Sequence, residues 1–181
     1  MPEGVSIEAV DIWFQDEARV GQRGTLSRIW ARVGSRPRLI RQQQNQYAYV
    51  LGAICPALGQ AVGLVMPHVN TQAMQHHLDE ISLSIPPSRH AVIVMDCAAW
   101  HTTQKLNLPS NLSLLSLPPT SPELNPVEQV WQWLRQRYWA NRTFQGYQAI
   151  VEACCTAWNA FASDPEKITS IGTRKWANLN I

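Results

Sequence analysis

Two short, strongly apolar segments constrain the fold of this chain more than any other feature. Ala91–Met95 is a continuous apolar run that leads directly into Asp96, and Leu112–Leu117 is stopped by Pro118-Pro119. Short apolar segments with such boundaries are typical of strands that are buried on both faces of a sheet. Because helices must then cover both faces, the sequence predicts an α/β domain.

Other segments alternate between strand and helix signals. Glu8–Phe14 is rich in β-branched and aromatic residues and predicts a first strand, which ends at Gln15-Asp16-Glu17. The turn residues Pro56–Gly59 predict a hairpin. In chain order, the expected elements are strands at Glu8–Phe14, Tyr47–Cys55 and Ala61–Met66, a helix capped by Asn70 or Thr71 that runs to about Ser84, strands at Ala91–Met95 and Leu112–Leu117 separated by a short helix at His101–Leu106, and helices at Pro126–Trp139, Gln145–Ala162 and Pro165–Ser170. This order predicts a mixed five-stranded sheet flanked by helices.

The length and composition fit one domain. At 181 residues, of which 45% are hydrophobic, the chain can bury one substantial core. No apolar run approaches the roughly 18 residues that span a membrane, and the first residues lack the features of a secretory signal. We therefore expect a cytoplasmic protein with a single domain at 1–181, whose core covers about 8–140 and whose C-terminal helices lie in 141–181. The four cysteines, Cys55, Cys97, Cys154 and Cys155, lack CxxC spacing and are expected to be free thiols.

The charge distribution indicates a polyanionic partner. The formal net charge is only +2, but no Asp or Glu occurs from Ala18 to Leu78. Arginine is permanently charged and its donors suit phosphate, so an uncompensated cluster favours nucleic acid binding over a merely solvated basic face. We expect the cluster in a long excursion with a short strand at Arg28–Val33. The expected DNA-binding residues are Arg19, Arg23, Arg28, Arg32, Arg36, Arg38 and Arg41.

Two aspartates follow predicted strands. Asp16 ends the first strand and Asp96 ends the fourth. If these strands are parallel neighbours, both carboxylates emerge at the carboxyl edge of the sheet, where open α/β sheets place their sites. Each aspartate taken alone is equally consistent with the simple end of a strand.

Glu128 is a third carboxylate of interest, and its position supports two interpretations. Asn125 is a good N-cap, Pro126 suits the first helical position, and Glu128 follows the cap by three residues, which is a capping-box arrangement. A carboxylate in the first helical turn is also kept ionised by the helix dipole, as a metal ligand requires. Glu17 and Glu123 are acidic neighbours of the proposed ligands and alternatives to them.

Three carboxylates at one site have a chemical use. Their negative charges repel one another, and a divalent cation bound between them makes the arrangement favourable. Magnesium prefers oxygen ligands and leaves coordination positions for water and phosphate. Two such ions about 3.5–4 Å apart can stabilise the attacking and leaving oxygens of a phosphodiester displacement. With the arginines nearby, this predicts metal-dependent chemistry on a nucleic acid.

Three sequence blocks resemble a known family. They are QDEA at 15–18, DCAAWH at 96–101 and LPPTSPELNPVE at 117–128. These blocks resemble those of the DDE transposases, and most closely the bacterial insertion-sequence branch (six-thirty-type elements) of the mariner superfamily. The last block is the most specific of the three, and the resemblance spans roughly Val10 to Arg137.

The resemblance implies a ribonuclease H-like fold and a function in DNA transposition. The metal ligands and catalytic residues would be Asp16, Asp96 and Glu128, holding two magnesium or manganese ions. The implied reactions are cleavage at the element ends and strand transfer by a 3′-hydroxyl at TA dinucleotides. The implied partners are DNA and further copies of the chain. The family normally carries an N-terminal helix-turn-helix region; here the chain begins almost at the catalytic strand, so we expect that region on a separate polypeptide or lost by truncation.

Some residues depart from the family pattern or have no assigned role. Only 31 residues lie between Asp96 and Glu128, Thr120 stands where tyrosine is frequent, and Cys97 and Ala99 replace smaller or polar residues. Truncation keeps an alternative open, namely a decayed or domesticated copy that binds DNA or a protein partner without catalysis. His101 has no assigned role. The tryptophans Trp131, Trp133, Trp139 and Trp158 of the closing helices are expected in helix-core or dimer packing rather than in base stacking.

Overall fold

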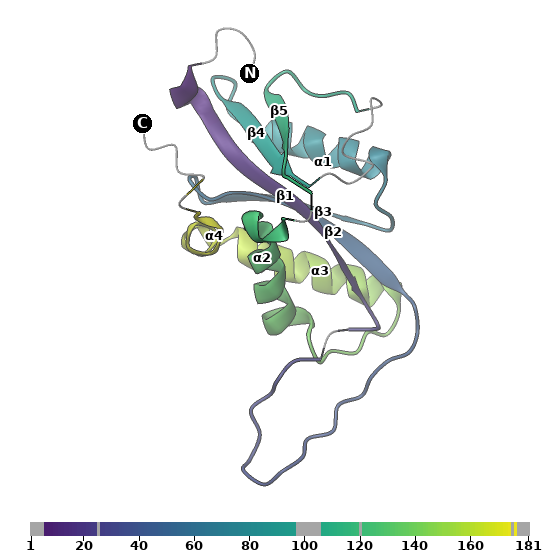
Figure 1. Ribbon diagram of the computed structural model, residues 1–181. Helices are drawn as coiled ribbons and strands as arrows, with labels where there is room; N and C mark the ends of the chain where they lie inside the picture. The colour runs from purple at the N-terminus through teal and green to yellow at the C-terminus, as the bar shows by residue number, and fades with distance from the viewer. Residues whose placement is uncertain (1–5, 25, 97–105, 120, 175, 177–181) are drawn as a thin grey trace.

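The computed structural model describes residues 6–24, 26–96, 106–119, 121–174 and 176. Five strands form one sheet: β1 (Val10–Gly21), β2 (Tyr47–Cys55), β3 (Gln60–Met66), β4 (His90–Met95) and β5 (Leu112–Ser116). Their order in the sheet is β3-β2-β1-β4-β5 (Figure 1). β2 is antiparallel to both β1 and β3, whereas β4 is parallel to β1 and β5 is parallel to β4. The predicted mixed five-stranded sheet is confirmed.

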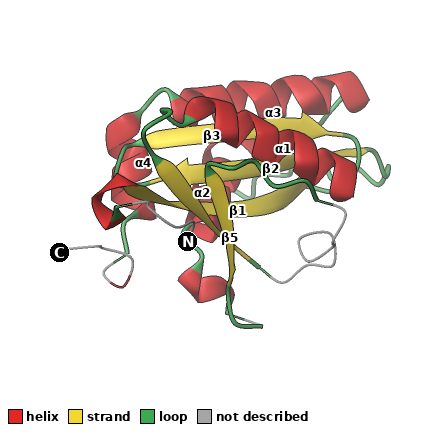
Figure 2. Cartoon of the chain, turned by 90° about the horizontal axis from the view of Figure 1, so that it is seen from above, coloured by secondary structure: helices red, strands yellow, loops and turns green. Residues whose placement is uncertain are grey.

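Helices cover both faces of this sheet (Figure 2). α1 (Thr71–Ser84) packs on one face, and α2 (Val127–Leu134), α3 (Tyr147–Ala162) and α4 (Pro165–Gly172) pack on the other. Short 3-10 turns lie at Ile7–Ala9 and Pro122–Leu124. The Asn70 side chain accepts a hydrogen bond of 2.9 Å from the Ala73 N–H and so caps α1, as predicted.

Each face of the sheet has its own apolar core. Trp13 of β1 belongs to the cluster beneath α1, whereas Phe14 belongs to the cluster beneath α2 and α3, because successive strand residues point to opposite faces. Of the closing tryptophans, Trp131, Trp139 and Trp158 are buried in the second cluster, and Trp133 is packed against it. The expected core packing is confirmed. Cys55 and Cys154 are buried free thiols, and Cys155 is exposed and free.

The extent of β1 differs from the prediction. The strand does not end at Gln15-Asp16-Glu17 but continues to Gly21, because β2 pairs with it from Phe14 to Gly21. Asp16 therefore lies inside the strand, and Arg19 lies in the strand rather than in the loop that follows it.

The Arg-rich excursion contains no strand among its described residues, so the predicted strand at Arg28–Val33 was wrong. Residues 22–46 form a long loop that projects away from the sheet (Figure 1). The side chains of 28–33 are exposed, and they have no neighbouring strand to supply ladder hydrogen bonds.

The helix predicted at Pro126–Trp139 divides into two parts. α2 ends at Leu134, and Arg135–Trp139 is a π-helical segment closed by a hydrogen bond of 2.7 Å from the Ala140 N–H to the Arg135 carbonyl. The predicted helix at His101–Leu106 lies, except for its last residue, outside the described residues. Within the described part of the chain, no helix is long and apolar enough to cross a membrane.

Candidate active site

Asp16 and Asp96 lie on two neighbouring strands, Asp16 within β1 and Asp96 directly after β4. The parallel pairing of β1 with β4 runs from Val10 with His90 to Phe14 with Val94, and each aspartate comes two residues after that last pair. The two aspartates therefore lie at corresponding positions where the parallel pairing ends. This is the carboxyl edge at which the sequence places them.

Asp16 is half-buried and has a defined hydrogen-bond donor. The indole Nε1 of Trp131, on α2, donates to its Oδ2 at 2.9 Å. Desolvation by burial and, next in size, the negative charge of Glu128 together raise the pKa of the Asp16 carboxyl to about 7. The structure thus brings Asp16 and Glu128 close enough for their charges to interact.

Glu128 reaches this site because the start of α2 is fastened to β1. The buried Asn125 Nδ2 donates to the Gln15 carbonyl at 2.8 Å, and its Oδ1 accepts from the Val127 N–H at 3.1 Å. The Asn125 N–H, which a capping box would give to the Glu128 side chain, donates instead to the Pro122 carbonyl at 3.0 Å. The exposed Glu128 carboxylate is thus not needed to satisfy that N–H.

Two glycines allow Trp131 to approach the sheet beside Asp16. Gly52 of β2 pairs with Asp16 across the strands, and Gly63 of β3 pairs with Gly52. A Cβ atom on Gly52 would lie 2.6 Å from the Trp131 ring and 2.5 Å from the Trp158 ring, and one on Gly63 would overlap Trp158. The two glycines therefore allow both indoles to pack directly on the strand backbone, next to Asp16.

The chemistry of this donor set fits a hard divalent cation. Asp16 and Glu128 supply carboxylate oxygens that disfavour each other's charge, and a cation between them would relieve that repulsion. Among the described residues, no group of three or more His, Cys, Asp or Glu side chains lies close enough together to hold a metal ion. The convergence of Asp16, Asp96 and Glu128 on one shared ion therefore stays a prediction.

The alternative carboxylates are placed less favourably. Glu17 is next to Asp16 in β1, so its side chain points to the opposite face of the sheet, where it accepts a hydrogen bond of 3.2 Å from Gln15 Nε2. Glu123 is exposed on the 3-10 turn that precedes α2. Cys97, Ala99, His101 and Thr120 lie outside the described residues.

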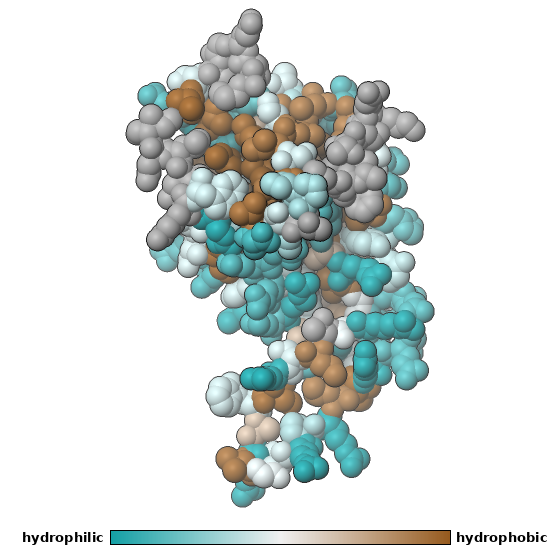
Figure 3. Space-filling model, viewed as in Figure 1, coloured by the Kyte–Doolittle hydropathy of each residue, from teal (hydrophilic) through white to brown (hydrophobic). Residues whose placement is uncertain are grey.

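All seven arginines of the predicted DNA-binding set are exposed. Arg19 lies on β1 with its guanidinium 5.2 Å from the centre of the Tyr47 ring, and Arg23 Nε donates to the Gln43 carbonyl at 3.2 Å. The other five lie on the projecting loop, where hydrophilic side chains alternate with exposed apolar ones such as Val33 and Ile40 (Figure 3). Between described residues, an ion pair joins Arg89 to Asp11, and none involves these seven arginines.

Sequence reasoning did not assign Trp131 or Asn125 to the site. Trp131 was expected only in packing, and Asn125 only as a helix cap. Their contacts with Asp16 and Gln15 join positions 115 and 110 residues apart. The one local signal was that Asn125 lies within the most specific of the three sequence blocks and that Trp131 follows the end of this block by three residues.

The sheet order, with carboxylates at the end of its parallel pair, is that of a ribonuclease H-like catalytic core. The chain matches the family described as DDE superfamily endonuclease over residues 11–151. It is also 52% identical over 132 residues to the uncharacterized protein y4pE/y4sA of Sinorhizobium fredii, a match that covers 73% of this chain and 98% of that protein. The chain therefore belongs to the DDE superfamily endonuclease family.

Solved structures of the Mos1 transposase share this fold. The paired-end complex with the left transposon end has a TM-score of 0.65 and 16% identity, covering 89% of this chain and 51% of that chain. The paired-end complex with Mn has a TM-score of 0.60 and 14% identity, covering 91% of this chain and 56% of that chain. The present chain thus spans about half the length of the Mos1 chain. At these identities the likeness shows the fold alone, and the expected ribonuclease H-like fold is confirmed.

Proposed function

We propose that this chain is the catalytic domain of a DNA transposase, which cleaves DNA at transposon ends and joins the 3′-hydroxyl to target DNA. We place it in the bacterial six-thirty-type branch of the mariner superfamily. The observation that carries the proposal is the proximity of Asp16 and Glu128 where β1 and β4 end their pairing, in a chain of the DDE superfamily endonuclease family.

The proposed catalytic and metal-ligating residues are Asp16, Asp96 and Glu128, which would hold two Mg²⁺ or Mn²⁺ ions. When bound, such ions stabilise the attacking and leaving oxygens of a phosphodiester displacement. The Trp131 N–H fixes Oδ2 of Asp16, and the backbone N–H of Glu17 also donates to this carboxylate, so its orientation toward a cation would be set by these two donors. Asn125 holds the start of α2, and with it Glu128, against β1.

The proposed partner of the basic surface is DNA. The exposed arginines of β1 and the 22–46 loop would bind the phosphate backbone with little sequence preference, since they are not neutralised by ion pairs within the described residues. Recognition of specific ends would come from a helix-turn-helix region on a separate polypeptide, and cleavage from an oligomer of this chain. A solved Mos1 transposase structure is a paired-end complex with the left transposon end, which supports DNA as the partner. The setting would be the bacterial cytoplasm, at the nucleoid when DNA is bound.

DNA nicking tests the proposal. With any separate end-binding polypeptide supplied, the chain should nick supercoiled plasmid DNA carrying its element ends in Mg²⁺ or Mn²⁺, and EDTA should abolish the reaction. Asp16→Asn should remove the activity, whereas Asp79→Asn, on the exposed side of α1 and far along the chain from the site, should retain it. DNA binding without any metal-dependent nicking would instead favour a domesticated or decayed copy.

A further inference from the structure

The outer edge of β3 has none of the features that usually keep a sheet edge unpaired. β3 is the end strand of the sheet, and no other described strand pairs with its outer side. Exposed edges are commonly blocked by Lys, Pro or a β-bulge. The sequence of β3, QAVGLVM, has no charged residue and no proline, and its pairing with β2 is continuous from Gln60 to Met66. Its outward-facing backbone N–H and C=O groups can therefore accept a further strand.

The apolar side chains of β3 are only half-buried. They are Ala61, Val62, Leu64, Val65 and Met66. Ala61 and Val65 lie on the sheet face covered by α3, and the other three lie on the face covered by α1. In the neighbouring strand β2, by contrast, every residue from Val50 to Cys55 is buried. A strand paired to the outer edge of β3 would cover the half-buried side chains on both faces.

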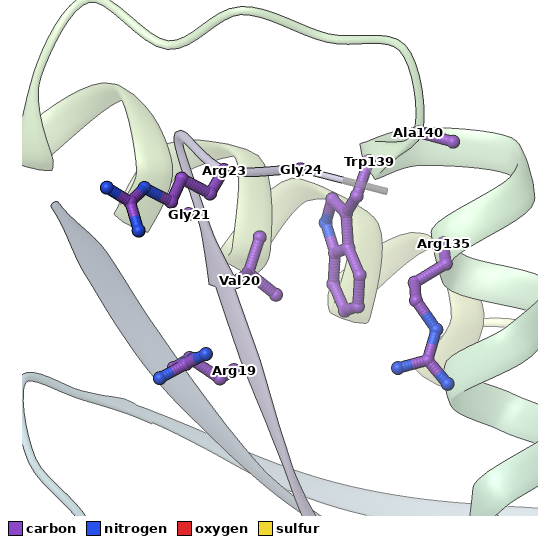
Figure 4. Close-up of a pocket in the computed structure, with 8 residues that line it drawn as sticks. All are labelled: Arg19, Val20, Gly21, Arg23, Gly24, Arg135, Trp139 and Ala140. Atoms are coloured by element: carbon purple, nitrogen blue, oxygen red, sulfur yellow. The ribbon is translucent and has the colours of Figure 1, made fainter. Parts of the chain in front are cut away.

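One flank of α3 borders this edge and carries no charge. Trp158 packs on β3, where a Cβ atom on Gly63 would lie 2.2 Å from its Nε1. The opposite flank faces Trp139 of the π-helical segment, which lines the pocket in Figure 4 and whose Nε1 donates to a carbonyl of α3 at 3.3 Å. Residues three and four apart share one side of a helix, so the flank with Trp158 also holds three uncharged residues. They are Val151, Cys155 and Ala162, of which Cys155 is exposed and the other two are half-buried.

On the other face of the sheet, the flank of α1 that borders β3 carries groups that can pair with a second copy of themselves. Gln75 and Ser82 hydrogen-bond to the segment 107–111 that precedes β5, so they mark the flank that points away from β3. The opposite flank carries the exposed His76 and Glu80, which are one helical turn apart. In an antiparallel pair of α1 helices, the imidazole of each copy therefore faces the carboxylate of the other.

A two-fold axis at Gly63 fits both faces. Antiparallel pairing of β3 with a second β3 about this axis places Ala61 opposite the partner subunit's Val65, and Val62 opposite the partner subunit's Leu64. Apolar and β-branched pairs of this kind stabilise antiparallel strands. The Trp158 ring of α3 lies over both β2 and β3, and strands lie about 4.8 Å apart. The two α3 axes would thus be roughly 10 Å apart, close to the 8–10 Å of packed helices.

We propose that two copies of this chain associate through β3, joining their two sheets into one continuous antiparallel junction with a two-fold axis near Gly63. The dimer itself does not depend on the proposed function, which names an oligomer but no surface for it. Asp16, Gly52 and Gly63 form one row across the sheet. The two candidate sites would therefore lie on the same face of the joined sheet, five strand spacings or roughly 24 Å apart.

Disulfide formation at the axis tests the proposal. Helical side chains lean toward the helix N-terminus, so the level of Gly63 beneath the Trp158 ring is close to Cys155. The full chain is oxidised with copper–phenanthroline and examined by non-reducing electrophoresis. Wild type should give a linked dimer, and Cys155→Ser should not. Gln148→Cys in the Cys155→Ser background moves the thiol along the same exposed side of α3, which sets the two thiols roughly 20 Å apart in antiparallel helices, and should not link.

Cys97 is present in all three proteins, so it cannot account for a difference between them. Equal linkage in wild type and the Gln148→Cys protein, or no linkage in wild type, would overturn the pairing.

Sedimentation equilibrium of edge variants gives a second test. Val62→Thr keeps the β-branched shape at the junction, whereas Val62→Lys places a charge there in each copy. Wild type and Val62→Thr should be dimers, and a folded Val62→Lys protein should be a monomer. A wild-type monomer or a Val62→Lys dimer would overturn the proposal; if Val62→Lys does not fold, the disulfide test decides.

Both measurements are made without DNA or divalent metal, so their outcome is separate from that of nicking. A β3-linked dimer that cannot nick DNA would keep this inference and reject the proposed function. A monomer that nicks DNA would do the reverse.

Discussion

The Asp16 carboxyl experiences two effects that disfavour its ionised form. Partial burial on the sheet face covered by α2 and α3 desolvates it, and the negative charge of Glu128 lies nearby, so its pKa rises from 3.8 to about 7. The folded chain therefore holds this proton more tightly than the unfolded chain does. Consequently the free energy of unfolding falls as the pH rises from about 4 to about 7, and this loss persists above pH 7.

Asp16→Asn should stabilise the metal-free chain at neutral pH. Asparagine keeps the size of the side chain and can still accept the Trp131 N–H, but it has no charge to bury. We expect a gain in the free energy of unfolding on the order of 2 kcal/mol at pH 8 that shrinks toward pH 4. Urea denaturation across this pH range measures it. Asp79→Asn is the control, and a pH-independent difference between Asp16→Asn and wild type would contradict the assignment.

Trp131 should act as a positioning residue for Asp16. Trp131→Phe removes the N–H that donates to Oδ2 and keeps an aromatic ring over Gly52. Loss of a hydrogen bond behind a metal ligand typically weakens metal binding about tenfold or more. Calorimetric titration with Mn²⁺ should show this loss for Trp131→Phe but not for Trp133→Phe, which alters a half-buried tryptophan of the same helix. Equal Mn²⁺ affinities in the two variants would mean that Trp131 serves packing alone.

At the scale of elements, the β2–β3 hairpin is shaped to receive α2 and α3. Gly52 and Gly63 have no Cβ atoms and so leave room for the indoles of Trp131 and Trp158. The two helices can therefore pack closer to the backbone of the sheet. This close approach brings the α2 helix within hydrogen-bonding distance of Asp16. The hairpin thus contributes to the candidate site although it supplies none of the proposed ligands.

Gly63→Ala should therefore destabilise the fold. Its new methyl group would overlap the Trp158 ring, and overpacking a tight core typically costs about 1–3 kcal/mol. Thermal unfolding should show a lower midpoint for Gly63→Ala. Gly24→Ala is the matched comparison, because the nearest atom to its added methyl lies 3.7 Å away. An unchanged midpoint in Gly63→Ala would show that Trp158 can move aside at little cost.

Elements with local signals were predicted from the sequence, and elements that depend on distant partners were not. The hairpin follows from Pro56–Gly59 and the start of α1 from Asn70, and the structure confirms both. β1 was predicted too short because its second half is held by β2, which lies beyond the loop at 22–46. The π-helical turn at Arg135–Trp139 carried no sequence signal that separates it from an α-helix.

At the scale of the whole molecule, β1 connects the candidate site to the basic loop. β1 carries Asp16 in its interior, Arg19 three residues later, and the Arg-rich loop beyond its end (Figure 1). The sequence indicated both the carboxylates and the arginines by residue type and spacing.

The central claim is that Glu128 is a metal ligand of the active site. Comparing the DNA-cleaving activities of Glu128→Gln and Glu123→Gln tests it most directly. Both glutamates lie near the start of α2, but only Glu128 interacts with Asp16 in the structure. The assay is cleavage of element ends in Mg²⁺ by the complete transposase, with any separate end-binding polypeptide supplied and thermal unfolding recorded for each variant. If Glu128 is a metal ligand, Glu128→Gln should keep its fold and lose cleavage by orders of magnitude, because the metal loses one of its few carboxylates. Glu123→Gln should cleave near the wild-type rate. A folded Glu128→Gln protein that cleaves as fast as wild type would contradict the account.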